Sequence, residues 1–303
     1  MSIWTDLGGI PFEQSFRDVK GVRTRTIEAG RGEAVIFLHG TGGHAEAFAR
    51  NFKRHAQHFR TIGLDMIGHG YTDAPDIEYT LDTFVEHVHD VVLALGYEQV
   101  SLVGESLGGM VAAHFAIRYP EHTRRIVMNT GVLMTRTEAD LKGLRDMLER
   151  TRKATGELTR EAVRTRLAWL MHEPKVNVTE ELVDVRYGIY SQPGRAKIMS
   201  RISQMVVNGV HDQSWVARYS NPEDLRRVQC PALIIWSKYN PSLQLENARK
   251  ALPYLRDGRM VVMEHSSHWP QWEEAELCDK VQIAFLLGEE VTAAPSENAA
   301  TAG

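Results

Sequence analysis

Ser106 and His268 are the residues whose types and surroundings best fit nucleophilic chemistry. Ser106 lies in the run Gly104-Glu105-Ser106-Leu107-Gly108, which has the G-x-S-x-G arrangement. In this arrangement a serine is held on a strained turn between a buried strand and a helix, and the small glycines avoid clashes there. A serine hydroxyl is a weak nucleophile unless a base takes its proton. His268 follows the last strand-like run and is the candidate base.

The sequence on either side of Ser106 predicts the strand and the helix that such a turn needs. The β-branched run Val100–Val103 is typical of a fully buried strand. The residues after Ser106 that share one helical face are Leu107, Met110, Val111, His114 and Phe115. Acyl transfer also needs donors aimed at the developing oxyanion. We expect these to be the backbone N–H groups of Leu107 and of Thr41, which lies in the loop after an earlier strand.

Strand-like and helical patterns alternate along most of the chain, and this predicts an α/β fold with a mostly parallel central sheet flanked by helices. The apolar runs are 34–38, 60–64, 100–103, 125–128, 231–236 and 259–263, after a two-stranded start. Between about 133 and 210 such runs disappear, and Arg, Glu, Leu and Met recur at helical spacing. We therefore expect a helical cap (lid) inserted after the sixth strand, over the carboxyl edge of the sheet where open α/β folds bind ligands.

The expected organisation is therefore an α/β core formed by residues 1–132 and 211–288, a cap formed by 133–210, and a disordered tail at 289–303.

Composition excludes several other classes of function. The 303 residues are 43% hydrophobic and 24% charged, and the net charge of -4 gives no support for a nucleic-acid or membrane partner. No leader or membrane-length apolar run occurs, so we expect a cytoplasmic protein. Cys230 and Cys278 are far apart and fit reduced thiols. The histidines lack metal-binding spacing, and we expect neither metal nor cofactor. A small-molecule carboxylate or ester is the expected partner, and the chain can form a homodimer.

The chain resembles an α/β-hydrolase and, more narrowly, the meta-cleavage product hydrolases. The wider resemblance covers about residues 20 to 288 and rests on His39-Gly40, the run Asp65–Gly70, the serine turn and His268-Trp269-Pro270. The narrower one rests on the cap, where the run Thr179–Arg186 followed by Gln192-Pro193 is similar to the lid segment of that family. These hydrolases split a carbon–carbon bond in the 2-hydroxy-6-oxo-dienoates formed by ring cleavage of catechols.

The resemblance implies roles for several residues. Arg186 takes the position of the arginine that binds the dienolate end of the substrate, and Trp269 that of an active-site tryptophan. Glu105 and Gly42 fall beside the substrate in the same comparison. Both lie where the chain departs from the family: the residue before the serine is commonly asparagine, and the loop at Thr41–His44 is shortened.

The third member of a Ser-His-acid triad has no carboxylate at its expected positions. After the strand 231–236 the matching residue is Asn240, and the other common position offers Asn129. An amide can orient an imidazole but cannot neutralise an imidazolium, and an aspartate-to-asparagine change costs a serine protease about 10,000-fold in turnover. Three interpretations are open: Asn240 is the native third member, the chain is an inactivated variant, or another acid reaches His268. The candidates for that acid are Glu246, Glu138 and Asp140.

The leading hypothesis for function is a serine-dependent carbon–carbon hydrolase. A carboxylesterase or lactonase on the same fold is the alternative, and the missing acid also permits a catalytically impaired ligand-binding protein. Epoxide hydrolases and dehalogenases use an aspartate where this chain has Ser106.

Overall fold

An eight-stranded sheet with strand order β1-β2-β4-β3-β5-β6-β7-β8 forms the centre of the protein. The computed structural model describes residues 3–291. The strands are β1 (Phe12–Val19), β2 (Val22–Ala29), β3 (Ala34–Leu38), β4 (Arg60–Leu64), β5 (Val100–Glu105), β6 (Thr123–Asn129), β7 (Ala232–Ser237) and β8 (Gly258–Met263). β1 pairs antiparallel with β2 and β2 with β4, and all other pairs are parallel. The prediction of a mostly parallel sheet is confirmed.

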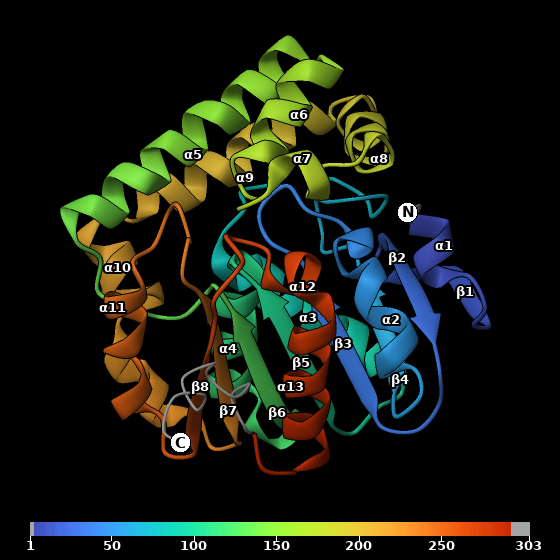
Figure 1. Ribbon diagram of the computed structural model, residues 1–303, viewed down its shortest axis with the longest axis vertical. Helices are drawn as coiled ribbons and strands as arrows, with labels where there is room; N and C mark the ends of the chain where they lie inside the picture. Colours follow the sequence, from blue (N-terminus) through green and yellow to red (C-terminus); the bar gives the residue numbers. More distant parts are fainter. Residues whose placement is uncertain (1–2, 292–303) are drawn as a thin grey trace, which may run out of the picture.

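Helices cover both faces of the sheet (Figure 1). α3 (Leu81–Ala94) and α4 (Leu107–Arg118) contact each other on one face, and α2 (Ala49–His55), α12 (Pro270–Glu273) and α13 (Ala275–Leu287) lie together on the other. The short α1 (Ile3–Leu7) packs on α2. The remaining core elements are η1 (Ala45–Phe48), η2 (Pro120–His122), η3 (Pro222–Arg227), α11 (Leu245–Arg249) and η4 (Leu252–Tyr254).

The segment after β6 is helical and lies over the carboxyl edge of the sheet (Figure 1), as the sequence predicts. It comprises α5 (Glu138–Glu157), α6 (Arg160–Ala168), α7 (Pro174–Asn177), α8 (Glu180–Tyr190) and α9 (Arg195–Gly209), with α10 (Gln213–Tyr219) leading back to the core. Threonine hydroxyls cap α5, α6 and α8, which satisfies N–H groups that a helix start leaves free. The exact core and cap boundaries stay a prediction, and most of the expected tail lies outside the described residues.

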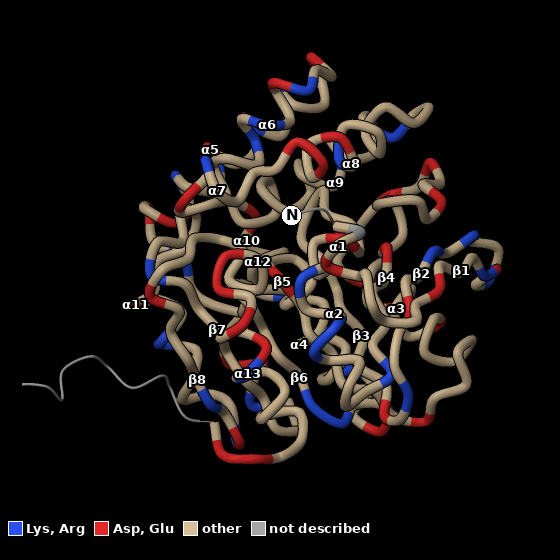
Figure 2. Tube along the Cα trace, turned by 45° about the vertical axis from the view of Figure 1, so that its right-hand side comes forward, with Lys and Arg blue, Asp and Glu red and all other residues tan. Residues whose placement is uncertain are grey.

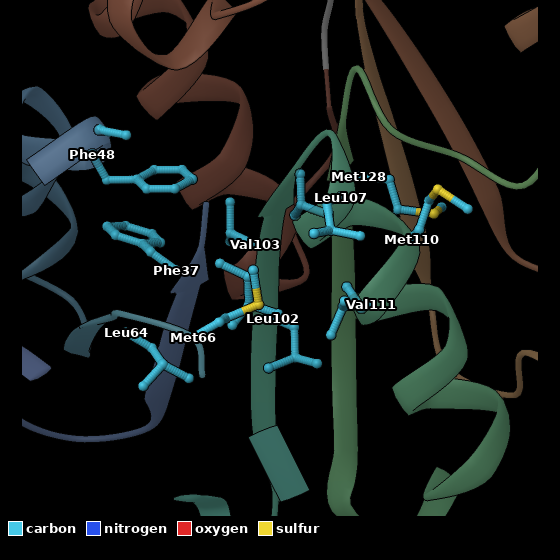
Figure 3. Close-up of a cluster of buried hydrophobic side chains, with 14 of the residues drawn as sticks. Phe37, Phe48, Leu64, Met66, Leu102, Val103, Leu107, Met110, Val111 and Met128 are labelled. Carbon is cyan, nitrogen blue, oxygen red and sulfur yellow. The ribbon is translucent and has the colours of Figure 1, made fainter. Parts of the chain in front are cut away.

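The hydrophobic core extends across the sheet on both of its faces (Figure 3). On one side Phe37 of β3 stacks on Phe48, with ring centroids 4.7 Å apart. On the other side, Met110 and Val111 of α4 pack near β5 and β6. Charged residues of both signs are interspersed along the chain (Figure 2). No helix in residues 3–291 is both long and apolar enough to cross a bilayer.

A buried ionic network fixes the loop after β3 that carries Thr41. Arg25 donates to Glu46 at 2.6 Å and to Asp65 at 3.0 Å, and all three side chains are buried. Asp65 also accepts the backbone N–H of Ala45 at 2.7 Å and that of Tyr71 at 2.8 Å. The loops after β3 and β4 are therefore held to β2 by one guanidinium and two carboxylates.

Replacing Arg25 by methionine tests this network. The change leaves two buried carboxylates without their cation, so we expect the free energy of unfolding to fall by about 3–5 kcal/mol. Urea denaturation followed by circular dichroism measures it. Lys142→Met is the matched control, because Lys142 pairs with Asp146 on the exposed side of α5 and such pairs contribute about 0.5 kcal/mol or less. Equal losses in the two variants would contradict the role given to Arg25.

Candidate active site

Ser106 occupies a strained turn between β5 and α4. Its backbone has φ 53° and ψ -113°, a left-handed conformation that is uncommon for a residue with a side chain. Such strain costs on the order of 1–3 kcal/mol and persists only where the surroundings enforce it. Here Ser106 N–H donates to the carbonyl of Asn129 at 2.9 Å, and a Cβ at Gly104 would come within 2.1 Å of the Gly108 carbonyl. The glycines thus let the chain turn closely enough to present the serine at the sheet edge.

His268 lies in the loop after β8 and is fixed by its own backbone. Its N–H donates to the carbonyl of Leu170 at 2.9 Å, and its carbonyl accepts the hydroxyl of Thr130 at 2.9 Å. One bond thus reaches the segment after α6 and the other the end of β6. The side chain is 3% exposed. Burial lowers the pKa of His268 to about 3, and the positive charge of Arg166 acts in the same direction.

The structure places Asn240 against His268, with 3.2 Å between Asn240 Oδ1 and His268 Nδ1. The same oxygen accepts from the backbone N–H of Ser242 at 3.2 Å and from its hydroxyl at 3.1 Å. Because Asn240 Oδ1 can only accept, the hydrogen of this contact belongs to Nδ1 of the imidazole. His268 Nε2 is therefore the nitrogen left to take a proton.

None of the three alternative acids named from the sequence lies against His268, so these three candidates are wrong. Asp140 caps the start of α5. It also accepts hydrogen bonds from the Gln244 N–H, at 2.6 Å, and from the Asn247 side chain, which holds the loop after β7. Glu246 pairs with Arg249, and Glu138 is exposed in the first turn of α5. Asn129, the other position considered, accepts from Gln282 at 3.3 Å on the α13 side.

Glu105, the residue before the serine, directs its carboxylate toward the base. Its Oε2 accepts the N–H of Gly40 at 2.7 Å, and its Oε1 lies 3.3 Å from His268 Nε2. The side chain is only 1% exposed. Burial raises the pKa of Glu105 to about 7, although the Gly40 N–H and the cations Arg186 and Arg166 oppose the shift.

Ser106 and His268 face one small cavity beneath the cap. Its walls are Gly40, Thr41, Gly43, Glu105, Ser106, Met147, Arg166, Leu170, His268 and Trp269. Ser106 Oγ makes no hydrogen bond to His268 Nε2 among the described residues, and in unliganded sites such bonds often form only with substrate. Thr41 lies in this wall and Leu107 begins α4, where the first N–H groups lack intrahelical acceptors.

The structure does not place Gly42 beside the substrate site, where the family resemblance implies it. It is not among the residues of the cavity wall, and its carbonyl accepts the hydroxyl of Tyr190 at 3.2 Å. A glycine is favoured at this position because φ is 73° and because a Cβ would lie only 2.5 Å from the Tyr190 hydroxyl oxygen. A role in joining the loop to α8 therefore fits Gly42 better than contact with a substrate.

Arg186 on α8 is buried directly behind Trp269. Its guanidinium carbon lies 5.1 Å from the centre of the Trp269 ring, and the side chain is 1% exposed. The donors Nε and Nη2 have no hydrogen-bond partner among the described residues. Burial lowers the pKa of Arg186. A buried cation with free donors is costly and is well suited to an anionic ligand.

Arg166 is a second buried cation in the site, and we did not identify it as a site residue from the sequence. It lies on α6, is 3% exposed and lines the cavity. Its Nε donates to Thr151 at 2.9 Å, whereas Nη1 has no partner among the described residues. Burial lowers the pKa of Arg166 to about 10. A signal was present, because Arg166 follows Val163 by three residues and precedes Leu170 by four, on the apolar face of its helix.

Comparisons with known proteins identify the family of the chain. The family described as alpha/beta hydrolase fold matches residues 33–275. A 2-hydroxymuconate semialdehyde hydrolase of Pseudomonas putida is 30% identical, with 88% of this chain and 91% of that protein aligned. A 2-hydroxy-6-oxo-6-(2'-aminophenyl)hexa-2,4-dienoic acid hydrolase of Metapseudomonas resinovorans is 28% identical, with 91% of each chain aligned.

Solved structures give the same result. The meta-cleavage product hydrolase CumD of Pseudomonas fluorescens IP01 superposes with a TM-score of 0.76 at 25% identity, covering 92% of this chain and 98% of that one. A serine hydrolase involved in carbazole degradation superposes with a TM-score of 0.75 at 27% identity, covering 92% and 100%. These matches agree with the strained serine turn and with the histidine that faces the same cavity. The chain belongs to the alpha/beta hydrolase fold family and is a hydrolase that resembles the meta-cleavage product hydrolases.

Proposed function

We propose that the protein hydrolyses a carbon–carbon bond in a 2-hydroxy-6-oxo-dienoate, with Ser106, His268 and Asn240 as its catalytic residues. The observation that carries the proposal is the buried Arg186 guanidinium with two free donors, which lies against Trp269 of the cavity wall and acts electrostatically on Glu105. A simple ester carries no charge that needs such a group. A dienolate does, since its negative charge must be stabilised in a site that excludes water.

The proposed reaction begins at the dienolate end of the substrate. Arg186, beside Trp269, stabilises the dienolate that forms when the 2-hydroxyl group of the substrate loses its proton, and that proton returns at C5, so the enol becomes the keto form with no net gain of protons. The ketonised chain then becomes a good carbon leaving group. This step uses no group other than the buried cation and the substrate itself.

Cleavage follows at the C6 carbonyl. Ser106 Oγ, or a water activated by His268, adds to that carbonyl as His268 Nε2 takes its proton. The N–H groups of Thr41 and Leu107 hold the oxyanion. The carbon–carbon bond then breaks, and the proton on His268 passes to the departing carbon. If Ser106 is the nucleophile, water hydrolyses the acyl-enzyme with His268 again as base.

We further propose that the enzyme works in the cytoplasm and as a homodimer. The thiols of Cys230 and Cys278, free in the structure, support a reducing compartment. Size-exclusion chromatography with light scattering measures the assembly.

Removing the nucleophile tests the assignment of Ser106. Ser106→Ala should slow bleaching of a yellow 2-hydroxy-6-oxo-dienoate by about 10,000-fold or more, because neither addition nor proton transfer can occur at that position. Absorbance decay under single-turnover conditions gives the rate. Ser101→Ala, in the strand that leads to the turn, is the control and should bleach at the wild-type rate. Retention of most activity in Ser106→Ala would exclude Ser106 as an essential group.

Replacing Arg186 separates carbon–carbon hydrolysis from esterase activity. Arg186→Met keeps much of the side-chain length but removes the cation, and we expect kcat on the dienoate to fall by about 100- to 1,000-fold. Hydrolysis of a p-nitrophenyl ester should change only a few-fold. Arg152→Met, on an exposed position of α5, serves as the control for loss of one arginine. Equal losses on both substrates, or a wild type that is much faster on esters than on dienoates, would favour a carboxylesterase or lactonase instead.

A further inference from the structure

The candidate base lacks a negative charge at the place where a triad normally supplies one. Asn240 orients His268 through Nδ1 but carries no charge to balance an imidazolium. His268 is buried, and Arg166 adds a positive charge nearby, so its protonated form is doubly disfavoured. A base in this environment needs a compensating anion if it is to take a proton at neutral pH.

Glu105 is the carboxylate nearest to that proton. Its Oε1 is 3.3 Å from His268 Nε2, on the opposite edge of the imidazole from Asn240. The position is fixed, because Oε2 is held by the Gly40 N–H at 2.7 Å and the residue directly precedes Ser106 in the turn. A hypothetical Cβ at Gly40 would lie 2.6 Å from Oε2, so the loop and the carboxylate are closely packed.

The protonation state of the His268 ring determines whether its contact with Glu105 is a hydrogen bond. Nδ1 carries a hydrogen for Asn240, so a neutral His268 has only a lone pair at Nε2. An ionised Glu105 would then face that lone pair without a bond. Once His268 is protonated, Nε2 gains a hydrogen, and the same contact becomes a charge-assisted hydrogen bond. The interaction is therefore stronger in the state that forms during catalysis.

We propose that Glu105 is the charge partner of His268, a positioning residue that stabilises the imidazolium from the Nε2 side and takes the place of the missing triad acid. The proposal rests on the proposed function only in using Ser106 and His268 as nucleophile and base. It replaces the substrate-contact role that the sequence comparison suggests for Glu105.

The proton balance of this step is simple. The Ser106 hydroxyl proton moves to His268 Nε2 as the bond from Ser106 Oγ to the acyl carbon forms. Glu105 stays ionised and accepts a hydrogen bond from the new N–H, but it does not take the proton. The proton later leaves His268 for the departing group, and the enzyme returns to its starting state.

Several charged or polar groups face the Glu105 carboxylate. They are the Gly40 N–H from the loop after β3, Arg166 from α6, Arg186 from α8, and His268 and Trp269 from the loop after β8. The two arginines favour the ionised carboxylate, and burial opposes it. Because the pKa of Glu105 is raised to about 7, Glu105 is mostly ionised above that pH and mostly protonated below it.

The test measures how fast Ser106 reacts with a fluorophosphonate probe, which depends on His268 as base but not on the natural substrate. In Glu105→Gln we expect labelling at pH 8 to slow by about 100-fold, since one general-base interaction contributes at least this much. In an Asn240→Asp background, where a carboxylate is restored at Nδ1, the same Glu105→Gln change should cost only a few-fold. The wild-type rate should rise with pH through about 7, and this rise should vanish in Glu105→Gln.

The controls separate charge from structure. Glu28→Gln removes a similarly buried glutamate on β2, far from the cavity, and should leave labelling unchanged. Asn240→Asp alone does not depend on the folding of a Glu105 variant: we expect it to accelerate labelling only a few-fold, because Glu105 already supplies the charge.

Two results would overturn the proposal. One is an equal cost of Glu105→Gln in both backgrounds. The other is an acceleration of about 1,000-fold or more by Asn240→Asp alone, which would show that the base lacks an acid. If labelling behaves as expected but no dienoate is cleaved, the substrate proposal fails and the role of Glu105 stands.

Discussion

Desolvation is the constraint on which the chemistry of this site depends. The cap and the sheet edge enclose His268, Glu105 and two arginines almost completely, and every charge among them is costly unless another group balances it. Burial raises the pKa of Glu105 and lowers those of His268 and Arg166. The same exclusion of water strengthens each interaction that forms with a charged substrate or transition state. The unpaired donors on Arg166 and Arg186 thus indicate where negative charge belongs.

The fold supports this site through a small number of long-range contacts. The strained turn at Ser106 joins β5 to α4 and is held by the Asn129 carbonyl of β6, whereas His268 is fixed by Leu170 after α6 and by Thr130 after β6. The cap therefore does more than cover the cavity. Through Arg166, Arg186 and Leu170 it contributes both the cations and part of the support for the base.

Local patterns allowed much of this arrangement to be predicted. The serine turn, the alternation of strands and helices, and the helical segment after the sixth strand follow from periodicity and glycine placement, and the structure confirms the fold. His268 could be selected because it follows the last strand. These features depend on residues close in sequence, where secondary-structure spacing determines which side chains share a face.

The remaining features depend on contacts between distant segments, which spacing cannot reveal. That Asn240 and not Asp140 reaches His268 is decided by how the loops after β7 and β8 pack, because Asp140 is occupied by the start of α5. The direction of the Glu105 carboxylate is decided by the Gly40 N–H, which no sequence pattern specifies. Arg166 was not singled out from the sequence, although its position on the apolar face of α6 was visible.

Carbon–carbon cleavage of a dienoate is the activity for which the buried cations of this site are best suited. The most direct measurement is mass spectrometry of the products formed from a 2-hydroxy-6-oxo-dienoate in oxygen-18 water. We expect a carboxylic acid that carries one oxygen-18 from water and a shorter 2-hydroxydienoate, in equal amounts. An unchanged dienoate, under conditions where the same preparation hydrolyses simple esters, would show that the protein is not a carbon–carbon hydrolase.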